Sequence, residues 1–255
     1  MEHYSNTKLR AYLKYEDGLA VLDLKEKGLS MVPDAVTELS EIKNLVLDKN
    51  NLIKLTAIIS KLKNLIVLKL DSNNITELPT EIGDLRELWG LWVSNNQLVS
   101  LPTSIQRLTK LEWLYLDGNK LTELPAEIGD LRELRQLWVR NNQLVGLPTS
   151  IQRLTKLERL YLDGNKLTEL PAEIGDLREL RELNVRHNPL TVDAMRRALK
   201  LKKKGVRVYD DAGKHSGYCS YLEVRKKTEI KFHYLPGKGK SFFFSVIGGF
   251  TNFWV

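Results

Sequence analysis

The hydrophobic residues of this chain follow a pattern that recurs every 23 residues. Each repeat begins with apolar residues spaced LxxLxL, passes through an asparagine to a further leucine, and ends in LPxxIxxL. Eight repeats, the last of them incomplete, begin at Leu19, Ile42, Leu65, Leu88, Leu111, Leu134, Leu157 and Leu180. A fixed period of this length is typical of proteins built from stacked structural units.

Each repeat predicts one short strand and one short turn of helix or extended chain. Leucines two apart, as in Leu114 and Leu116, point to the same face of a strand. The Leu-Pro pair interrupts any helix, and the IxxL that follows spaces apolar residues for one or two helical turns. Neither piece buries its leucines alone, so the repeats must stack. We therefore expect an α/β solenoid, a curved horseshoe with a parallel concave sheet of about eight strands and helical or extended convex segments.

The asparagine in each repeat has a structural interpretation. Its side-chain amide can donate and accept hydrogen bonds to the backbone of neighbouring turns, which predicts a ladder along the solenoid. The ladder residues are Asn50, Asn73, Asn96, Asn119, Asn142, Asn165 and Asn188. The first repeat has Lys27 at this position and the second has Thr56 in place of proline, as expected of atypical terminal repeats.

Part of the repeat array is an internal duplication. Residues 95–140 and 141–186 differ only at four aligned pairs, namely Ser100/Gly146, Trp113/Arg159, Gln136/Glu182 and Trp138/Asn184. Within each copy, a basic LPTSIQRLTK turn alternates with an acidic LPAEIGDLRE turn. The alternation predicts ion pairs between neighbouring turns on the convex side, each contributing about 0.2 to 1 kcal/mol when exposed.

Both ends of the array are predicted to carry helical caps. We expect residues 1–18 to form an N-terminal cap with a helix over residues 6–16, because Ser5 can cap it and apolar residues follow at helical spacing. A second helix should begin at Thr191 or Asp193 and end at Gly205. Residues 19–209 are thus interpreted as the solenoid with its C-terminal cap.

Residues 210–255 form a separate tail of different composition. The chain has a net charge of +7, and residues 200–255 alone hold 12 Lys or Arg against 4 Asp or Glu, so the repeats are nearly neutral. Nucleic acid is therefore not an expected partner of the solenoid. Two interpretations of the tail stay open. It is an extension without a defined role or the remnant of a truncated gene, or its basic part, Lys200 to Lys240, contacts a membrane surface or nucleic acid.

Residue chemistry argues against catalysis and against a cofactor or metal. His215, Cys219 and His233 do not have the spacing of a zinc site, and Gly213-Lys214 lacks the other residues of a phosphate-binding loop. The periodic carboxylates of AEIGDLRE face solvent rather than one another, so they predict no acid-base pair. Cys219 is the only cysteine, and the N-terminus has no secretory signal or membrane-length apolar run. We expect a cytoplasmic, monomeric, non-enzymatic protein.

The residues most informative about function are those on the concave, solvent-facing side of each strand. At the fifth position of four consecutive repeats stand Trp92, Tyr115, Trp138 and Tyr161, with Trp89 and Trp113 beside them and Arg140 in the flanking row. One interpretation is that these rings only pack on each other along the sheet. The other is that they form a protein-binding surface, since contiguous aromatic patches act as anchors in interfaces.

With LPxxIGxL and LxxLxLxxNxL in units of 23 residues, residues 19–190 resemble intracellular leucine-rich repeats of the Ras-group and leptospiral types and the arrays of Roco GTPases. The resemblance implies a scaffold in signal transduction that binds a protein, such as a small GTPase, on its concave face without catalysis. It also leaves open a fragment of a multidomain, Roco-like signalling enzyme, although the tail matches no GTPase or kinase sequence.

Overall fold

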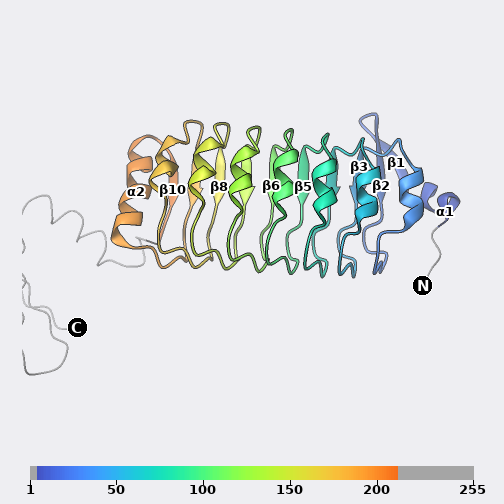
Figure 1. Cartoon of the computed structure of the whole chain (residues 1–255), viewed down its shortest axis with the longest axis horizontal. Helices are drawn as coiled ribbons and strands as arrows, with labels where there is room; N and C mark the ends of the chain where they lie inside the picture. Colours follow the sequence, from blue (N-terminus) through green and yellow to red (C-terminus); the bar gives the residue numbers. More distant parts are fainter. Residues whose placement is uncertain (1–4, 212–255) are drawn as a thin grey trace, which may run out of the picture. The chain divides into compact units, whose positions relative to one another are not determined.

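The repeats stack in chain order into a single solenoid (Figure 1). The structure is a computed structural model that describes residues 5–211. The chain divides into two units, Met1–Tyr209 and Asp210–Val255. His215, Cys219, His233 and most of the basic tail lie outside the described residues, so the interpretations of the tail stay predictions.

Each repeat contributes one strand to a continuous sheet. Neighbouring strands are parallel and in register, so that Leu91, Leu114 and Leu137 occupy equivalent positions. This confirms the predicted solenoid. The repeat strands are β2 (Leu19–Asp23), β3 (Asn44–Val46), β4 (Val67–Lys69), β5 (Gly90–Trp92), β6 (Trp113–Tyr115), β7 (Gln136–Trp138), β8 (Arg159–Tyr161) and β9 (Glu182–Asn184).

A short 3₁₀ helix lies on the other side of the core in seven of the repeats (Figure 1). In six of them the helix follows a proline in extended conformation, and in the second repeat Thr56 takes that place. The fixed φ of proline suits the residue that precedes the turn. The helices are η1 (Asp34–Glu38), η2 (Ala57–Lys61), η3 (Thr80–Asp84), η4 (Thr103–Arg107), η5 (Ala126–Asp130), η6 (Thr149–Arg153) and η7 (Ala172–Asp176).

The N-terminal cap differs from the helix predicted over residues 6–16. Helix α1 (Asn6–Arg10) is capped by Ser5 as expected, but it ends at Arg10. Strand β1 (Leu13–Glu16) then pairs antiparallel with β2. The prediction is wrong from Ala11 onward. The chain leaves the helix after Arg10, and Asp17 and Gly18, with positive φ angles of 48° and 78°, form the hairpin turn between β1 and β2.

The C-terminal cap contains the predicted helix. Helix α2 (Val192–Lys203) starts after Thr191, whose hydroxyl accepts a hydrogen bond from the Ala194 N–H at 3.3 Å. Its buried residues are Ala194, Ala198 and Leu201. Strand β10 (Arg207–Tyr209) then pairs parallel with β9. With β1 and β10 added, the sheet has ten strands within the described residues, two more than predicted.

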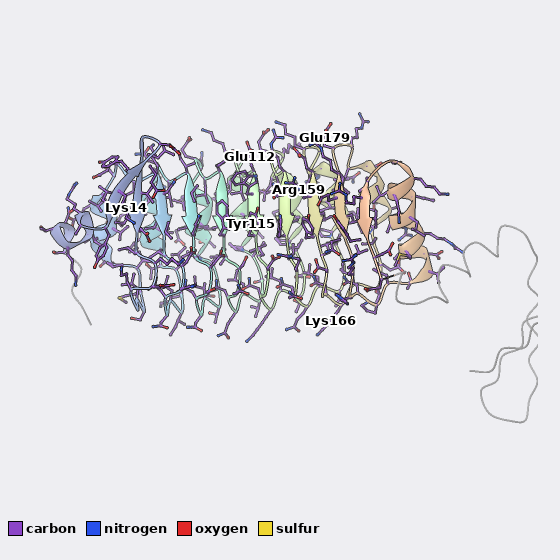
Figure 2. The ribbon with its side chains drawn as sticks, turned by 180° about the vertical axis from the view of Figure 1, so that it is seen from behind. Lys14, Glu112, Tyr115, Arg159, Lys166 and Glu179 are labelled. Carbon is purple, nitrogen blue, oxygen red and sulfur yellow. The ribbon has the colours of Figure 1, made fainter. Side chains whose placement is uncertain are left out.

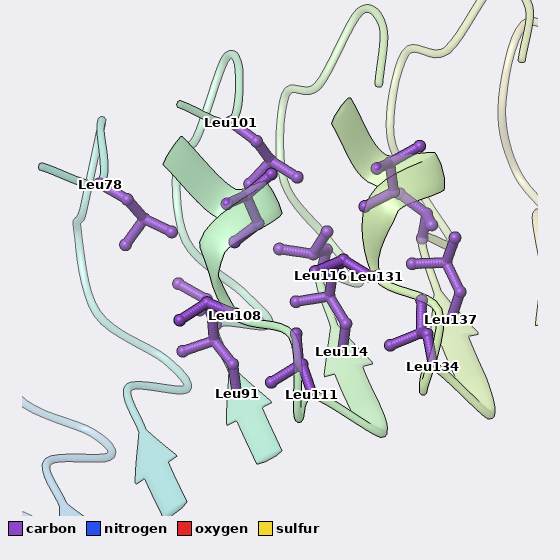
Figure 3. Packing of buried hydrophobic residues seen from close by; sticks show 14 of the residues in the cluster. Leu78, Leu91, Leu101, Leu108, Leu111, Leu114, Leu116, Leu131, Leu134 and Leu137 are labelled. Carbon is purple, nitrogen blue, oxygen red and sulfur yellow. The ribbon is translucent and has the colours of Figure 1, made fainter. Parts of the chain in front are cut away.

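The core is a stack of leucines between the strands and the 3₁₀ helices (Figure 3). Leu91, Leu114 and Leu137 point inward from β5, β6 and β7 and have no solvent exposure. Leu108 and Leu131 close the same space from the opposite side and are also fully buried. Each leucine therefore packs against the equivalent residue of the next repeat, so burial is continuous along the solenoid.

The predicted asparagine ladder is present. The side chain of Asn119 donates to the carbonyl of Val93 in the preceding repeat at 2.9 Å and to that of Leu116 in its own at 3.0 Å. Its Oδ1 accepts from the Leu98 N–H at 2.9 Å. The same three bonds recur at every ladder asparagine from Asn50 to Asn188. The ladder thus satisfies backbone groups that the short strands leave unpaired.

The convex ion pairs expected from the alternating turns are also present. Lys110 contacts Glu87 at 2.6 Å, and the duplicated pair Lys156 and Glu133 has the same distance. Both pairs are exposed to about half of their side-chain surface. Exposed pairs of this kind contribute little stability, so the fold does not depend on them.

The isosteric change Asn119→Asp tests the ladder. It keeps the Oδ1 acceptor but replaces the donors to Val93 and Leu116 by a buried carboxylate oxygen. We expect the free energy of unfolding to fall by about 2–4 kcal/mol, because buried carbonyls lose their donor. Urea denaturation measures the effect. The same change at exposed Asn141 is the control, and an equal loss there would contradict the structural role of the ladder.

Candidate functional site

The candidate site lies on the outer face of the sheet, where the side chains are not required by the core. In β6, β7 and β8 the middle residue is buried and the outer two are only partly buried, whereas in β5 Gly90 is buried as well. The last residues of β5, β6, β7 and β8 are aromatic and lie in register on neighbouring strands. They are Trp92, Tyr115, Trp138 and Tyr161. Figure 2 shows Tyr115 over the strands, on the side away from the 3₁₀ helices.

These four rings form one continuous column. The centroids of Trp92 and Tyr115 are 5.3 Å apart, with the ring planes only 9° from parallel. Tyr115 and Trp138 are 5.0 Å apart, and Trp138 and Tyr161 are 4.4 Å apart. The rings therefore pack on each other along the sheet, as one of the sequence interpretations expected, with the other two ring pairs tilted by 32° and 40°. All four rings are partly buried. This packing presents a continuous surface of ring edges and faces.

A second pair of rings widens the column at its N-terminal end. Trp89, one residue before β5, lies 4.1 Å from Trp113 between centroids. Trp113 in turn meets Trp92 edge to face at 5.9 Å. Gly90 makes room for this arrangement, since a Cβ atom there would lie 2.2 Å from the Trp92 ring. We call the surface formed by Trp89, Trp92, Trp113, Tyr115, Trp138 and Tyr161 the aromatic face.

Two polar residues that the sequence analysis did not assign to the site form hydrogen bonds with the ring edges. The side-chain carbonyl of Gln136 accepts hydrogen bonds from the Tyr115 hydroxyl at 3.0 Å and the Trp138 indole N–H at 3.2 Å. The Tyr161 hydroxyl donates to the carboxylate of Glu182. Burial and this carboxylate raise the pKa of Tyr161 to about 12. The sequence did contain a signal for Gln136. It is two residues before Trp138 on the same strand, and residues two apart on a strand point to the same face.

Arg140 lies against the aromatic face, as predicted. Its guanidinium is 4.5 Å from the Trp138 ring centroid and 5.9 Å from that of Tyr161. Two of its nitrogens donate to one carboxylate oxygen of Asp117, at 2.9 and 2.8 Å. Such a paired, ring-stacked arginine is held in one orientation. Arg140 is therefore a fixed rim residue of the aromatic face.

Acidic residues form a row next to the aromatic face. The carboxylate of Asp48 accepts the Asp71 N–H at 2.9 Å, and that of Asp71 accepts the Ser94 N–H at 2.6 Å. Burial raises the pKa of Asp71 to about 6, with nearby Asp48 contributing in the same direction. Asp117 differs, because Arg140 neutralises it. Burial also raises the pKa of Asp48, so these three carboxylates comprise two whose charged form burial disfavours and one that is paired.

The described residues form no cluster suited to metal binding. Within residues 5–211, no group of three or more His, Cys, Asp or Glu side chains is arranged to hold an ion. No helix in this part of the chain has the length and apolarity needed to cross a membrane.

Comparison with known proteins points to one repeat family. A model described as a leucine-rich repeat region matches residues 111–206. The comparison with curated proteins gives no match. Among solved structures, a leucine-rich repeat protein of Leptospira interrogans is 35% identical with a TM-score of 0.54, covering 66% of this chain and 49% of its own.

Two further structures are similar over much of the solenoid. The ectodomain of the Arabidopsis thaliana membrane receptor kinase GASSHO1/SCHENGEN3 is 36% identical with a TM-score of 0.59, over 63% of this chain and 20% of its own. The leucine-rich repeat domain of the type III effector XopL is 27% identical with a TM-score of 0.59, over 68% of this chain and 70% of its own. The chain thus spans about half the length of the leptospiral protein chain and a fifth of the plant receptor ectodomain.

The acidic row predicts that replacing Asp71 and replacing Asp117 by asparagine change the free energy of unfolding at pH 7 in opposite directions. Folded Asp71 binds its proton more tightly than the unfolded residue, whose pKa is 3.8. Its contribution to stability is therefore full below about pH 4 and lost as the pH rises through about 6. Asp71→Asn should raise the free energy of unfolding at pH 7 by up to about 2 kcal/mol, allowing for solvent screening. The gain should vanish at pH 4.

Asp117→Asn is the matched control, because this carboxylate is paired with Arg140. We expect it to lower the free energy of unfolding at pH 7. Urea titrations between pH 4 and pH 7 measure both variants. A shift of the two variants in the same direction would contradict the assigned environments of the acidic row.

Proposed function

Because this chain is a leucine-rich repeat protein, we propose that it is a non-catalytic binding module that receives a protein partner on its aromatic face. The site consists of the aromatic face together with Arg140. The observation that carries the proposal is the continuous ring column over four strands, formed at positions that the core does not use.

The fold accepts other residues at the same position. Val46, Lys69 and Asn184 stand there in other repeats, and the middle residue of each strand is buried regardless. Four consecutive aromatic side chains are therefore an addition to the solenoid. Large, rigid rings supply contact area at little entropic cost, which is why tryptophan and tyrosine are common energetic anchors of interfaces.

The comparisons support binding of a protein ligand by this type of fold. The plant receptor ectodomain was solved in complex with CASPARIAN STRIP INTEGRITY FACTOR 2. For the chain described here we propose a scaffold in signal transduction, with a small GTPase or another signalling protein as partner. The proposed compartment is the cytoplasm, because Cys219 is the only cysteine and the solenoid needs no disulfide.

The double variant Trp113→Ala, Trp138→Ala tests the proposal. Random 12-residue peptides displayed on phage are selected against the full chain, and the recovered peptides are synthesised with a fluorophore. Fluorescence polarisation should show at least about 30-fold weaker binding to the double variant, because two central anchors are removed. Intrinsic tryptophan fluorescence should also change on binding, since four of the five tryptophans lie on the aromatic face.

The control is the convex double variant Glu127→Ala, Glu173→Ala, which leaves the aromatic face intact. We expect it to bind the peptides as tightly as the original chain. Binding that survives loss of both tryptophans, or that is lost in the convex variant, would contradict the proposed site. Circular dichroism must first show that both variants remain folded.

A further inference from the structure

The two copies of the 46-residue duplication differ mainly on the outer face of the sheet. Three of their four differences are Trp113/Arg159, Gln136/Glu182 and Trp138/Asn184, all at outward positions of strands. Exposed turn residues such as Lys110 and Lys156 are identical in the two copies. The outer face therefore changes along the solenoid from aromatic to charged.

Arg159 stands where this change occurs. It opens β8, in register with Gln136 of β7 and Glu182 of β9. Figure 2 shows Arg159 over the strands. Its charge acts on the hydroxyls of Tyr115 and Tyr161, whose pKa values it lowers against the larger effect of burial. Arg159 thus lies against the C-terminal part of the aromatic face.

The guanidinium of Arg159 has no ion pair or side-chain hydrogen bond within residues 5–211. The adjacent carboxylate of Glu182 is engaged on both oxygens, by Tyr161 and by Arg207 at 2.9 Å. Neighbouring arginines differ, since Arg135 contacts Glu158 at 2.8 Å and Arg140 contacts Asp117. A partner that covers the aromatic face would desolvate the Arg159 charge, and this is costly unless the partner supplies an anion.

The distance along the sheet between Arg159 and Trp113 determines where the anion must lie in the partner. Arg159 is two strands from Trp113, which is roughly 10 Å at about 4.8 Å per strand. An extended peptide advances about 3.3 Å per residue, so about three residues span this interval. On the other side of the aromatic face, the Nζ of Lys69 lies 5.5 Å from the Trp92 ring centroid, but the carboxylates of Asp48 and Asp71 offset its charge. The anion therefore belongs on the Arg159 side of the apolar anchor.

We propose that the partner presents an extended segment in which an aromatic or large aliphatic side chain packs on Trp113 and a carboxylate about three residues away pairs with Arg159. This inference rests on the proposed function and specifies the chemistry of the partner. Arginine favours a carboxylate here because its planar guanidinium can donate two parallel hydrogen bonds to it.

The test uses Arg159→Gln in the full chain and the peptides selected from the random 12-residue library. Gln136 occupies the equivalent position in the preceding repeat, so the sheet already accepts glutamine there. Selected peptides should carry Asp or Glu about three positions from an aromatic or large aliphatic residue. Changing that acid to its amide, or Arg159 to Gln, should each weaken binding about 10-fold or more.

Combining the two changes should cost little more than either alone, because both remove the same interaction. Arg178→Gln is the control, an exposed arginine outside the strands, and it should bind like the original chain. Its thermal midpoint and that of Arg159→Gln should match the original. Equal losses in both arginine variants would overturn the assigned pairing.

The outcomes separate this inference from the proposed function. Peptides without an acid that lose affinity with Trp113→Ala, Trp138→Ala but not with Arg159→Gln would overturn the carboxylate pairing alone. Peptides insensitive to every variant of the outer face would overturn both. The absence of any sequence enriched over the Trp113→Ala, Trp138→Ala chain would also count against both.

Discussion

The structure depends on the ladder of asparagine amides that joins each repeat to the next. Three-residue strands pair few backbone groups, and the loops that follow them contain buried backbone groups such as the Leu98 N–H. Asn119 and its equivalents satisfy those groups from both sides, so every repeat needs its neighbour. The asparagine hydrogen bonds and the buried leucines thus recur with the same 23-residue period. Each repeat is stabilised by its neighbours, and the residues at outward positions of the strands are free to vary.

The outward side chains can form a binding surface because the leucine core does not depend on them. The core fixes the strands about 4.8 Å apart, which is close enough for rings on neighbouring strands to stack. Stacking, the Gln136 hydrogen bonds and the Arg140 pairing hold the aromatic face in one arrangement before any partner binds. A surface organised in this way loses little conformational freedom on binding. The aromatic face is thus held in place by the strands on which it lies.

Most of the solenoid could be predicted from the sequence because the leucine and asparagine spacings leave few alternatives. The N-terminal cap was predicted less well. The apolar residues up to Leu13 have helical spacing, but the Asp17-Gly18 turn allows Leu13–Glu16 to pair with β2 as a strand instead. The aromatic residues were found by position. Their partial burial and the roles of Gln136 and Glu182 were not, because they depend on side-chain rotamers and on contacts 21 residues apart.

The central claim, that a partner covers the aromatic face, is tested most directly by hydroxyl-radical footprinting with mass spectrometry. The full chain is labelled with and without a saturating bound peptide, and oxidation is measured at each aromatic residue. The account predicts protection of Trp92, Trp113, Tyr115, Trp138 and Tyr161, with no change in the 3₁₀ turns. Protection confined to those turns, with the aromatic face oxidised as before, would contradict it.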